Sequence, residues 1–89
     1  MGLEKSVQQR IDLVFSSSEL GQDFVINMLG DMRPCSMIGI SFEDWMSASI
    51  VKGIREETLN TLNYLLEKQD QKPLTLEQLG QVYYSLRGY

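Results

Sequence analysis

The chain has 89 residues, of which 43% are hydrophobic and 22% are charged, and its net charge is −4 at pH 7. This length has room for one domain with a modest core, and this composition excludes intrinsic disorder. Eight basic against twelve acidic residues disfavour nucleic acid as the main partner, because phosphate binding depends on concentrated lysine and arginine. We therefore expect residues 1–89 to form a single globular domain.

The content of cysteine and histidine limits the chemistry that the protein can perform. Cys35 is the only cysteine and there is no histidine. An intrachain disulfide is therefore impossible, and the commonest general base and usual zinc ligand is absent. No signal-peptide-like run begins the sequence, and no apolar stretch approaches the ~20 residues that span a bilayer. We predict a non-catalytic protein of the reducing cytoplasm, without a metal, cofactor or small-molecule substrate.

One pattern that is typical of helix starts occurs in three copies. In each copy, a hydroxyl residue is followed three positions later by an acidic or amide side chain, and the hydroxyl residues are Ser16, Ser41 and Thr75. The hydroxyl accepts a hydrogen bond from a free amide of the first turn, and the later side chain bonds back to the amide of the capping residue. The sequence therefore predicts helix starts at these three residues.

Two helices are expected in the first third of the chain. Apolar residues at helical spacing predict the first helix over 3–15. The second is predicted over 17–29, where apolar residues cover most of the circumference, and Gly30 is expected to end it.

The next segment, residues 30–40, is predicted to be the longest connection. Pro34 disfavours a helical conformation at the residue before it. Within this connection, residues 36–40 could form a short extended piece, but nothing else in the sequence offers it a partner strand.

From Ser41 to about Gln69 the sequence is helical in pattern, but its apolar face rotates. At about 100° per residue, the apolar positions after Gly53 lie roughly 150° from those before it. Because glycine inside a helix costs about 1 kcal/mol relative to alanine, a kink or break near Gly53 is favoured. The alternative is one straight helix with two apolar faces, of which the second would need another chain to cover it.

A polar turn precedes the last helix, which is predicted over 76–87. Its apolar stripe consists of Leu76, Leu79, Val82, Tyr83 and Leu86. Together these elements predict an all-α fold, a compact bundle of four or five short helices.

The most suggestive surface is rich in methionine and aromatic residues. Four of the five methionines lie between Met28 and Met46, close to Phe42 and Trp45. Methionine-rich surfaces adapt to partners, and tryptophan is frequent in binding hot spots. The predicted partner-binding residues are Met32, Met37, Phe42, Trp45, Met46 and Ile50, together with Tyr84 on the last helix. Alternatively, the residues between Met28 and Met46 close the open end of the bundle.

The predicted function is a small, acidic, non-catalytic interaction module, such as an adaptor, inhibitor or accessory protein. Phe42 and Trp45 would enter an apolar groove of a partner while Glu43 and Asp44 lie at the rim, or the same surface would close a homodimer. A second hypothesis is a dimeric, nucleic-acid-linked regulator that uses its C-terminal helices. That hypothesis requires the basic residues to gather on one face, namely Lys52, Arg55, Lys68, Lys72 and Arg87. An enzyme would instead require a deep pocket with convergent carboxylates or tyrosines.

Overall fold

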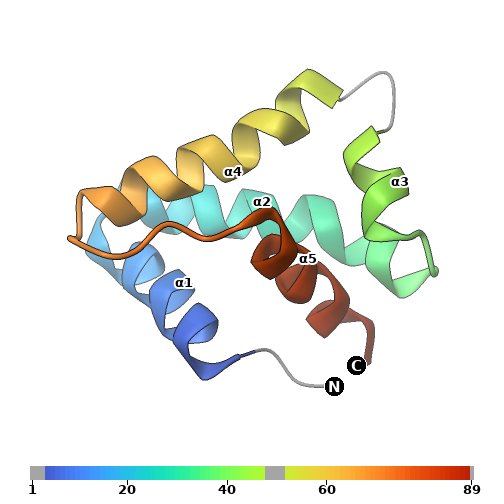
Figure 1. The fold of residues 1–89 in the computed structure, drawn as a ribbon, viewed down its shortest axis with the longest axis horizontal. Coiled ribbons are helices and arrows are strands. Elements are labelled where there is room, and N and C mark those ends of the chain that lie inside the picture. The colour runs from blue at the N-terminus through green and yellow to red at the C-terminus, as the bar shows by residue number, and fades with distance from the viewer. Residues whose placement is uncertain (1–3, 48–51, 89) are drawn as a thin grey trace.

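The computed structural model describes residues 4–47 and 52–88, and all of its regular structure is helical (Figure 1). The predicted all-α bundle is therefore confirmed. The elements are α1 (Lys5–Ser17), α2 (Glu19–Met37), α3 (Phe42–Ser47), α4 (Lys52–Glu67), α5 (Leu76–Ser85) and a short 3₁₀ turn, η1 (Leu86–Gly88).

The longest helix, α2, organises the bundle, because each of the other four α-helices packs against it. In Figure 1, α4 lies along the upper edge, and α1 lies below the C-terminal end of α4. α3 and α5 lie toward the N-terminal end of α4, and α2 runs behind the other helices. The buried side chains form one continuous core, which includes Val7, Ile11, Val14, Val25, Met28, Met32, Phe42, Trp45, Leu62, Leu65, Leu66, Leu74, Leu79, Val82 and Tyr83.

The α1–α2 turn comes two residues later than predicted. Ser18, not Ser16, is the capping residue, and its Oγ accepts a hydrogen bond from the Gly21 amide at 3.0 Å. The Ser16 and Ser17 hydroxyls instead donate to carbonyls of the preceding turn, those of Asp12 and Val14, at 2.9 and 2.8 Å. Those two serines therefore continue α1, and the chain reverses at Ser18 alone.

The prediction that the second helix ends at Gly30 is wrong, because α2 continues through Pro34 to Met37. Pro34 has no N–H to donate to the carbonyl four residues earlier, but both Gly30 and Pro34 are exposed, so water can reach that carbonyl. Beyond Gly30, Met32 and Ser36 are fully buried, and the Ser36 Oγ donates to the carbonyl of Tyr83 at 2.6 Å. Packing on this buried side outweighs the local signals that disfavour a helix.

Residues 36–40 are likewise not extended, since residues 36 and 37 end α2 and residues 38–40 form the turn that follows it. Gly39, with φ of 91°, adopts the left-handed conformation, and its amide donates to the Ser36 carbonyl at 3.2 Å. The next amide, that of Ile40, donates to the Cys35 carbonyl at 3.1 Å. This pair of bonds is the Schellman motif, so Gly39 ends the helix in the way predicted for Gly30.

The predicted interruption near Gly53 is confirmed, because two helices replace the long helical segment. Ser41 caps α3 as predicted, with its Oγ accepting from the Asp44 amide at 3.1 Å. α3 ends at Ser47 and α4 begins at Lys52, and the two ribbons point in different directions in Figure 1. Residues 48–51, which include the predicted contact residue Ile50, lie outside the described residues.

The start of α5 agrees with the sequence, and its position is set by the segment before it. Thr75 and Gln78 form the full capping box, with bonds of 3.1 and 3.0 Å between each side chain and the other residue's amide. Upstream, the Asn63 side chain of α4 both donates to the Leu74 carbonyl and accepts from its amide, at 3.0 and 2.7 Å. Leu76 is the exception to the predicted stripe, because its side chain is exposed.

Candidate functional site

Three of the predicted partner-binding side chains lie in the core of this chain. Trp45 is 1% exposed, Met32 is 0% and Phe42 is 6%. The rings of Phe42, Trp45 and Tyr83 pack together, with centroids 5.6–5.9 Å apart. The prediction that these side chains form an exposed surface is therefore wrong, and the alternative, that they close the end of the bundle, describes their positions.

The remaining predicted contact residues are placed differently. Met46 is half-buried against the core, whereas Met37 and Tyr84 are exposed. Met37 lies at the end of α2 and Tyr84 lies on α5, so the two come from separate elements. Of the predicted set, Tyr84 has the most developed surroundings, because it lines a groove that also reaches Phe42.

The basic residues do not gather on one face. Arg55 is buried, and its guanidinium donates a hydrogen bond to the Trp45 carbonyl. The same guanidinium lies 4.6 Å from the centre of the Trp45 ring, and Arg55 forms an ion pair with Asp31 at 3.2 Å. Arg87, on η1, donates to the carbonyl of Ser36, near the end of α2, and to that of Ile40, in the α2–α3 connection. Lys68 stacks on Tyr64 beyond the C-terminal end of α4, which lies far from η1 in Figure 1. Among the described residues, the expected basic face is therefore absent.

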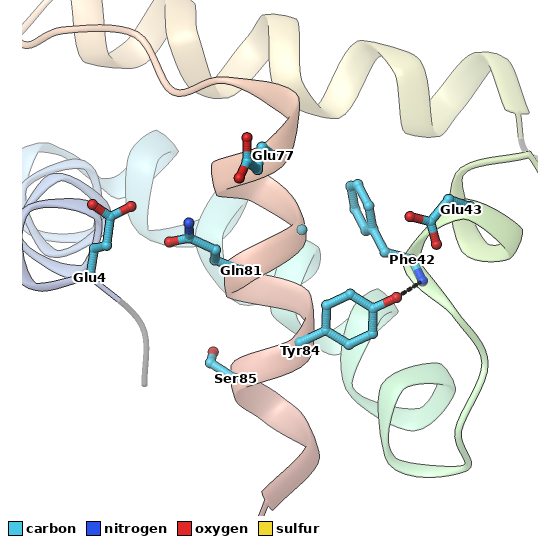
Figure 2. Close-up of a pocket in the computed structure, with 8 residues that line it drawn as sticks. Glu4, Phe42, Glu43, Glu77, Gln81, Tyr84 and Ser85 are labelled. Carbon is cyan, nitrogen blue, oxygen red and sulfur yellow. Dashed lines mark hydrogen bonds between the residues drawn. The ribbon is translucent and has the colours of Figure 1, made fainter. Parts of the chain in front are cut away.

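The groove lies over α5, between the beginnings of α1 and α3, and has a volume of about 530 Å³. Figure 2 shows α5 running between these two elements, with Glu4 on one side and Phe42 and Glu43 on the other. Side chains of the exposed face of α5 project between them. The lining residues are Glu4, Phe42, Glu43, Glu77, Gly80, Gln81, Tyr84 and Ser85.

The aromatic part of the groove is held in place by contacts on several sides. The Tyr84 Oη accepts a hydrogen bond from the Phe42 amide at 2.8 Å, which is the dashed line in Figure 2. The Arg87 guanidinium lies 4.7 Å from the centre of the Tyr84 ring, and Tyr83 meets the same ring edge-on. The Tyr84 side chain is thus fixed before any ligand binds, so its immobilisation adds little entropic cost to binding.

Gly80 allows the Phe42 ring of α3 to pack directly on α5. A Cβ atom at position 80 would lie 3.1 Å from the Phe42 ring, which is tighter than an ordinary van der Waals contact. Because Gly80 has no side chain, nothing at this position fills the groove, and α3 can pack against α5.

The rim of the groove is acidic. Glu4, Glu43 and Glu77 are exposed, and no side-chain hydrogen bond or ion pair within the described part of the chain engages their carboxylates. Between them, the side-chain oxygen of Gln81 is buried and accepts no hydrogen bond from the described residues. A ligand with positive charge and N–H donors would complement both features.

This arrangement is suited to non-covalent recognition. The groove is open, and the three carboxylates come from different elements around it (Figure 2). Within residues 4–47 and 52–88, no three Cys, Asp or Glu side chains are grouped so that they could hold a metal ion. The sequence predicted Phe42, Glu43 and Tyr84 as contact residues, and placed Glu77, Gly80 and Gln81 beside Tyr84 without assigning them to a site. Glu4 and Ser85 were not predicted. The spacing of Glu77, Gln81 and Tyr84 on one helical face was the available signal for the α5 part.

We expect Tyr83, whose ring packs against Phe42 and Tyr84, to make the fold sensitive to alkaline pH. Burial raises the pKa of the Tyr83 phenol above its ordinary value near 10, with the nearby Cys35 thiol adding to the shift. The folded state therefore retains the proton longer than the unfolded state, and stability is lost as pH rises above about 10. We expect the urea midpoint to fall between pH 9 and pH 11, within the alkaline window that this raised pKa sets.

The matched variant for this prediction is Tyr83→Phe. It removes the titrating group, and the Ile40 carbonyl that accepts from Tyr83 Oη keeps its second donor, Arg87. A smaller alkaline loss in Tyr83→Phe than in wild type is expected, and equal losses would contradict the assignment to Tyr83.

Comparisons with models of known protein families, with curated proteins and with solved structures find no match. Among the described helices, none has the length and apolar character needed to cross a membrane.

Proposed function

We propose that the protein is a small, non-catalytic interaction module that binds a basic, amphipathic segment of a partner protein in the groove over α5. The observation that supports this proposal is the combination of an aromatic floor, formed by Phe42 and Tyr84, with a rim of glutamates that no described side chain engages. This proposal keeps the class of function expected from the sequence and moves the contact surface from the buried Trp45 to the exposed face of α5.

The two parts of the groove would contribute differently to binding. Apolar side chains of the partner would pack mainly on the exposed Tyr84 ring, beside the small part of Phe42 that lines the groove. Aromatic side chains supply much of the affinity in interfaces of this kind. The carboxylates of Glu4, Glu43 and Glu77 would attract lysine and arginine side chains, which raises the association rate and favours basic partners over acidic ones. Because these charges are exposed, salt would weaken the attraction.

The second hypothesis, a nucleic-acid-linked regulator, has no comparable support. Its basic residues are divided between the core, η1 and the far end of α4. An acidic groove would also repel phosphate. We retain the reducing cytoplasm as the proposed compartment, since the lone Cys35 offers no disulfide.

The proposal can be tested with two designed helical peptides of about 15 residues, long enough to form a marginal helix. Both carry the same leucine stripe, one with lysine and the other with glutamate on the polar face. We expect fluorescence anisotropy to show that the lysine peptide binds and the glutamate peptide does not. The double variant Glu43→Lys/Glu77→Lys should reduce the affinity for the lysine peptide by about tenfold, because it reverses two charges of the rim.

The matched control is Glu57→Lys/Glu67→Lys, which makes the same change in charge on exposed positions of α4 outside the groove. This control should bind the lysine peptide nearly as well as wild type. An equal loss of peptide binding in both double variants would show that binding depends only on the overall charge, and the groove would then be excluded as the binding site.

A further inference from the structure

A second surface, separate from the groove, lies along the exposed face of α2. Six exposed residues follow one another at alternating spacings of four and three, the period of a helix–helix contact seam. They are Glu19, Asp23, Ile26, Gly30, Arg33 and Met37. We propose that this face binds the same face of a second copy of the chain, forming an antiparallel, two-fold symmetric homodimer.

The face is free to make this contact. The core-facing side of α2 is formed by Val25, Met28, Met32 and Ser36, whereas Ile26 and Met37 on the other side are each 53% exposed. α2 runs at the back of the bundle in Figure 1, behind α5 and the segment before it. Two large apolar side chains of this face are thus left in water, opposite the packed side of the helix.

The identity of the occupant follows from the charges, because the central part of the face, from Asp23 to Arg33, complements itself. In an antiparallel pair whose two-fold axis passes at the level of Met28, a residue before Met28 meets the residue of the second copy that lies equally many positions after Met28. Asp23 then lies opposite Arg33 of the second copy, and the symmetry forms the same pair twice. Neither side chain is engaged in a hydrogen bond or ion pair with any described residue of its own chain.

The shape of the face agrees with the same register. Ile26 lies opposite Gly30 of the second copy, and the space above Gly30 is open, since a Cβ atom there would meet nothing within 4 Å. The isoleucine side chain therefore projects into the notch that the glycine leaves, and the backbones can approach closely. A parallel pair would instead place Asp23 against Asp23 and Ile26 against Ile26, which repels and crowds.

The α2 face and the groove can be occupied independently. The groove is lined by residues at the beginning of α1, at the beginning of α3 and on α5, and none of its lining residues belongs to α2. One pair of helices buries less area than a standard interface, so we expect weak association, with a dissociation constant on the order of 100 μM.

The test is sedimentation velocity on the full chain from about 10 μM to about 1 mM, a range that brackets the expected constant. Asp23→Arg and Arg33→Asp should each weaken association by about tenfold, because each places like charges opposite one another. The double variant Asp23→Arg/Arg33→Asp restores opposite charges across the two-fold axis, and its dimer should have the dissociation constant of the wild type. Recovery in the double variant is specific to the antiparallel register.

Two further variants separate the interface from general effects on the fold. Gly30→Ala should weaken the dimer by filling the notch while leaving the circular dichroism spectrum unchanged. Ile26→Ser should weaken it as well, whereas Ile38→Ser should not, although Ile38 is more exposed, at 76%. A wild-type chain that stays monomeric at about 1 mM overturns the proposal. A dimer that the double charge variant fails to restore overturns it equally, as does a dimer abolished by Glu43→Lys/Glu77→Lys.

Discussion

Replacing Gly21 with alanine is expected to remove about 3 kcal/mol or more of the free energy of unfolding, a large fraction of the total for a domain of this size. A Cβ atom at position 21 would lie 2.2 Å from the backbone carbonyl oxygen of Val14. That oxygen belongs to α1 and cannot rotate away, so α1 and α2 must separate where their contact is closest. Urea denaturation of Gly21→Ala, followed by circular dichroism, measures the loss.

Gly30→Ala, in the same helix, is the control for this prediction. The chemical change is identical, but a Cβ atom at position 30 meets nothing within 4 Å. The substitution should therefore raise the free energy of unfolding by about 0.5–1 kcal/mol through the lower entropy of the unfolded chain. Equal effects of the two substitutions would mean that helix propensity, and not the approach of α1, determines the outcome at Gly21.

The second large effect is expected for Trp45→Ala, with a loss of about 3–5 kcal/mol. The side chain is almost completely buried between Phe42 and Tyr83, and the Arg55 guanidinium covers its ring. Removing it leaves a cavity in the aromatic cluster and removes the ring over which the Arg55 charge lies. Since Trp45 is the only tryptophan, urea unfolding should be followed by circular dichroism in both proteins.

Trp45→Phe and Tyr64→Ala make this prediction specific. The Trp45 indole nitrogen has no hydrogen-bond partner among the described residues, so Trp45→Phe removes volume but breaks no hydrogen bond between them. This substitution should cost roughly half as much. Tyr64 is an exposed aromatic residue on α4, and its removal should cost less than about 1 kcal/mol. A loss for Trp45→Ala as small as that for Tyr64→Ala would contradict the position of Trp45 in the core.

The helix starts were largely predictable because a capping residue and its partner are three positions apart in the sequence. Thr75 and Gln78 form both predicted hydrogen bonds, and at Ser41 the side chain accepts the predicted bond from the Asp44 amide. The end of α2 was not predictable in this way. Gly30 and Pro34 are local signals for a helix end, but the helix continues because Met32 and Ser36 are buried against residues far away in the sequence. Local patterns contain no information about these distant contacts.

The candidate site illustrates the same limit. Tyr84 could be identified as an aromatic residue off the apolar stripe of its helix, yet its neighbour across the groove, Phe42, lies on another helix. The apolar character of Trp45 was visible in the sequence, but hydrophobicity alone does not distinguish an interface from a core. The acidic rim required the fold, because Glu4, Glu43 and Glu77 come together only when α1, α3 and α5 are assembled.

The contacts that join the end of α2 and the α2–α3 connection to α5 and η1 have a consequence for folding during synthesis. Ser36 and Ile40 bond to Tyr83 and Arg87, and Tyr83 covers the Trp45 ring. A ribosome-bound chain that lacks α5 therefore leaves its aromatic cluster open to water. Chains are made at roughly 5–20 residues per second, so Trp45 is exposed for seconds before Tyr83 emerges. During this interval the nascent chain offers chaperones an apolar surface that the finished protein hides.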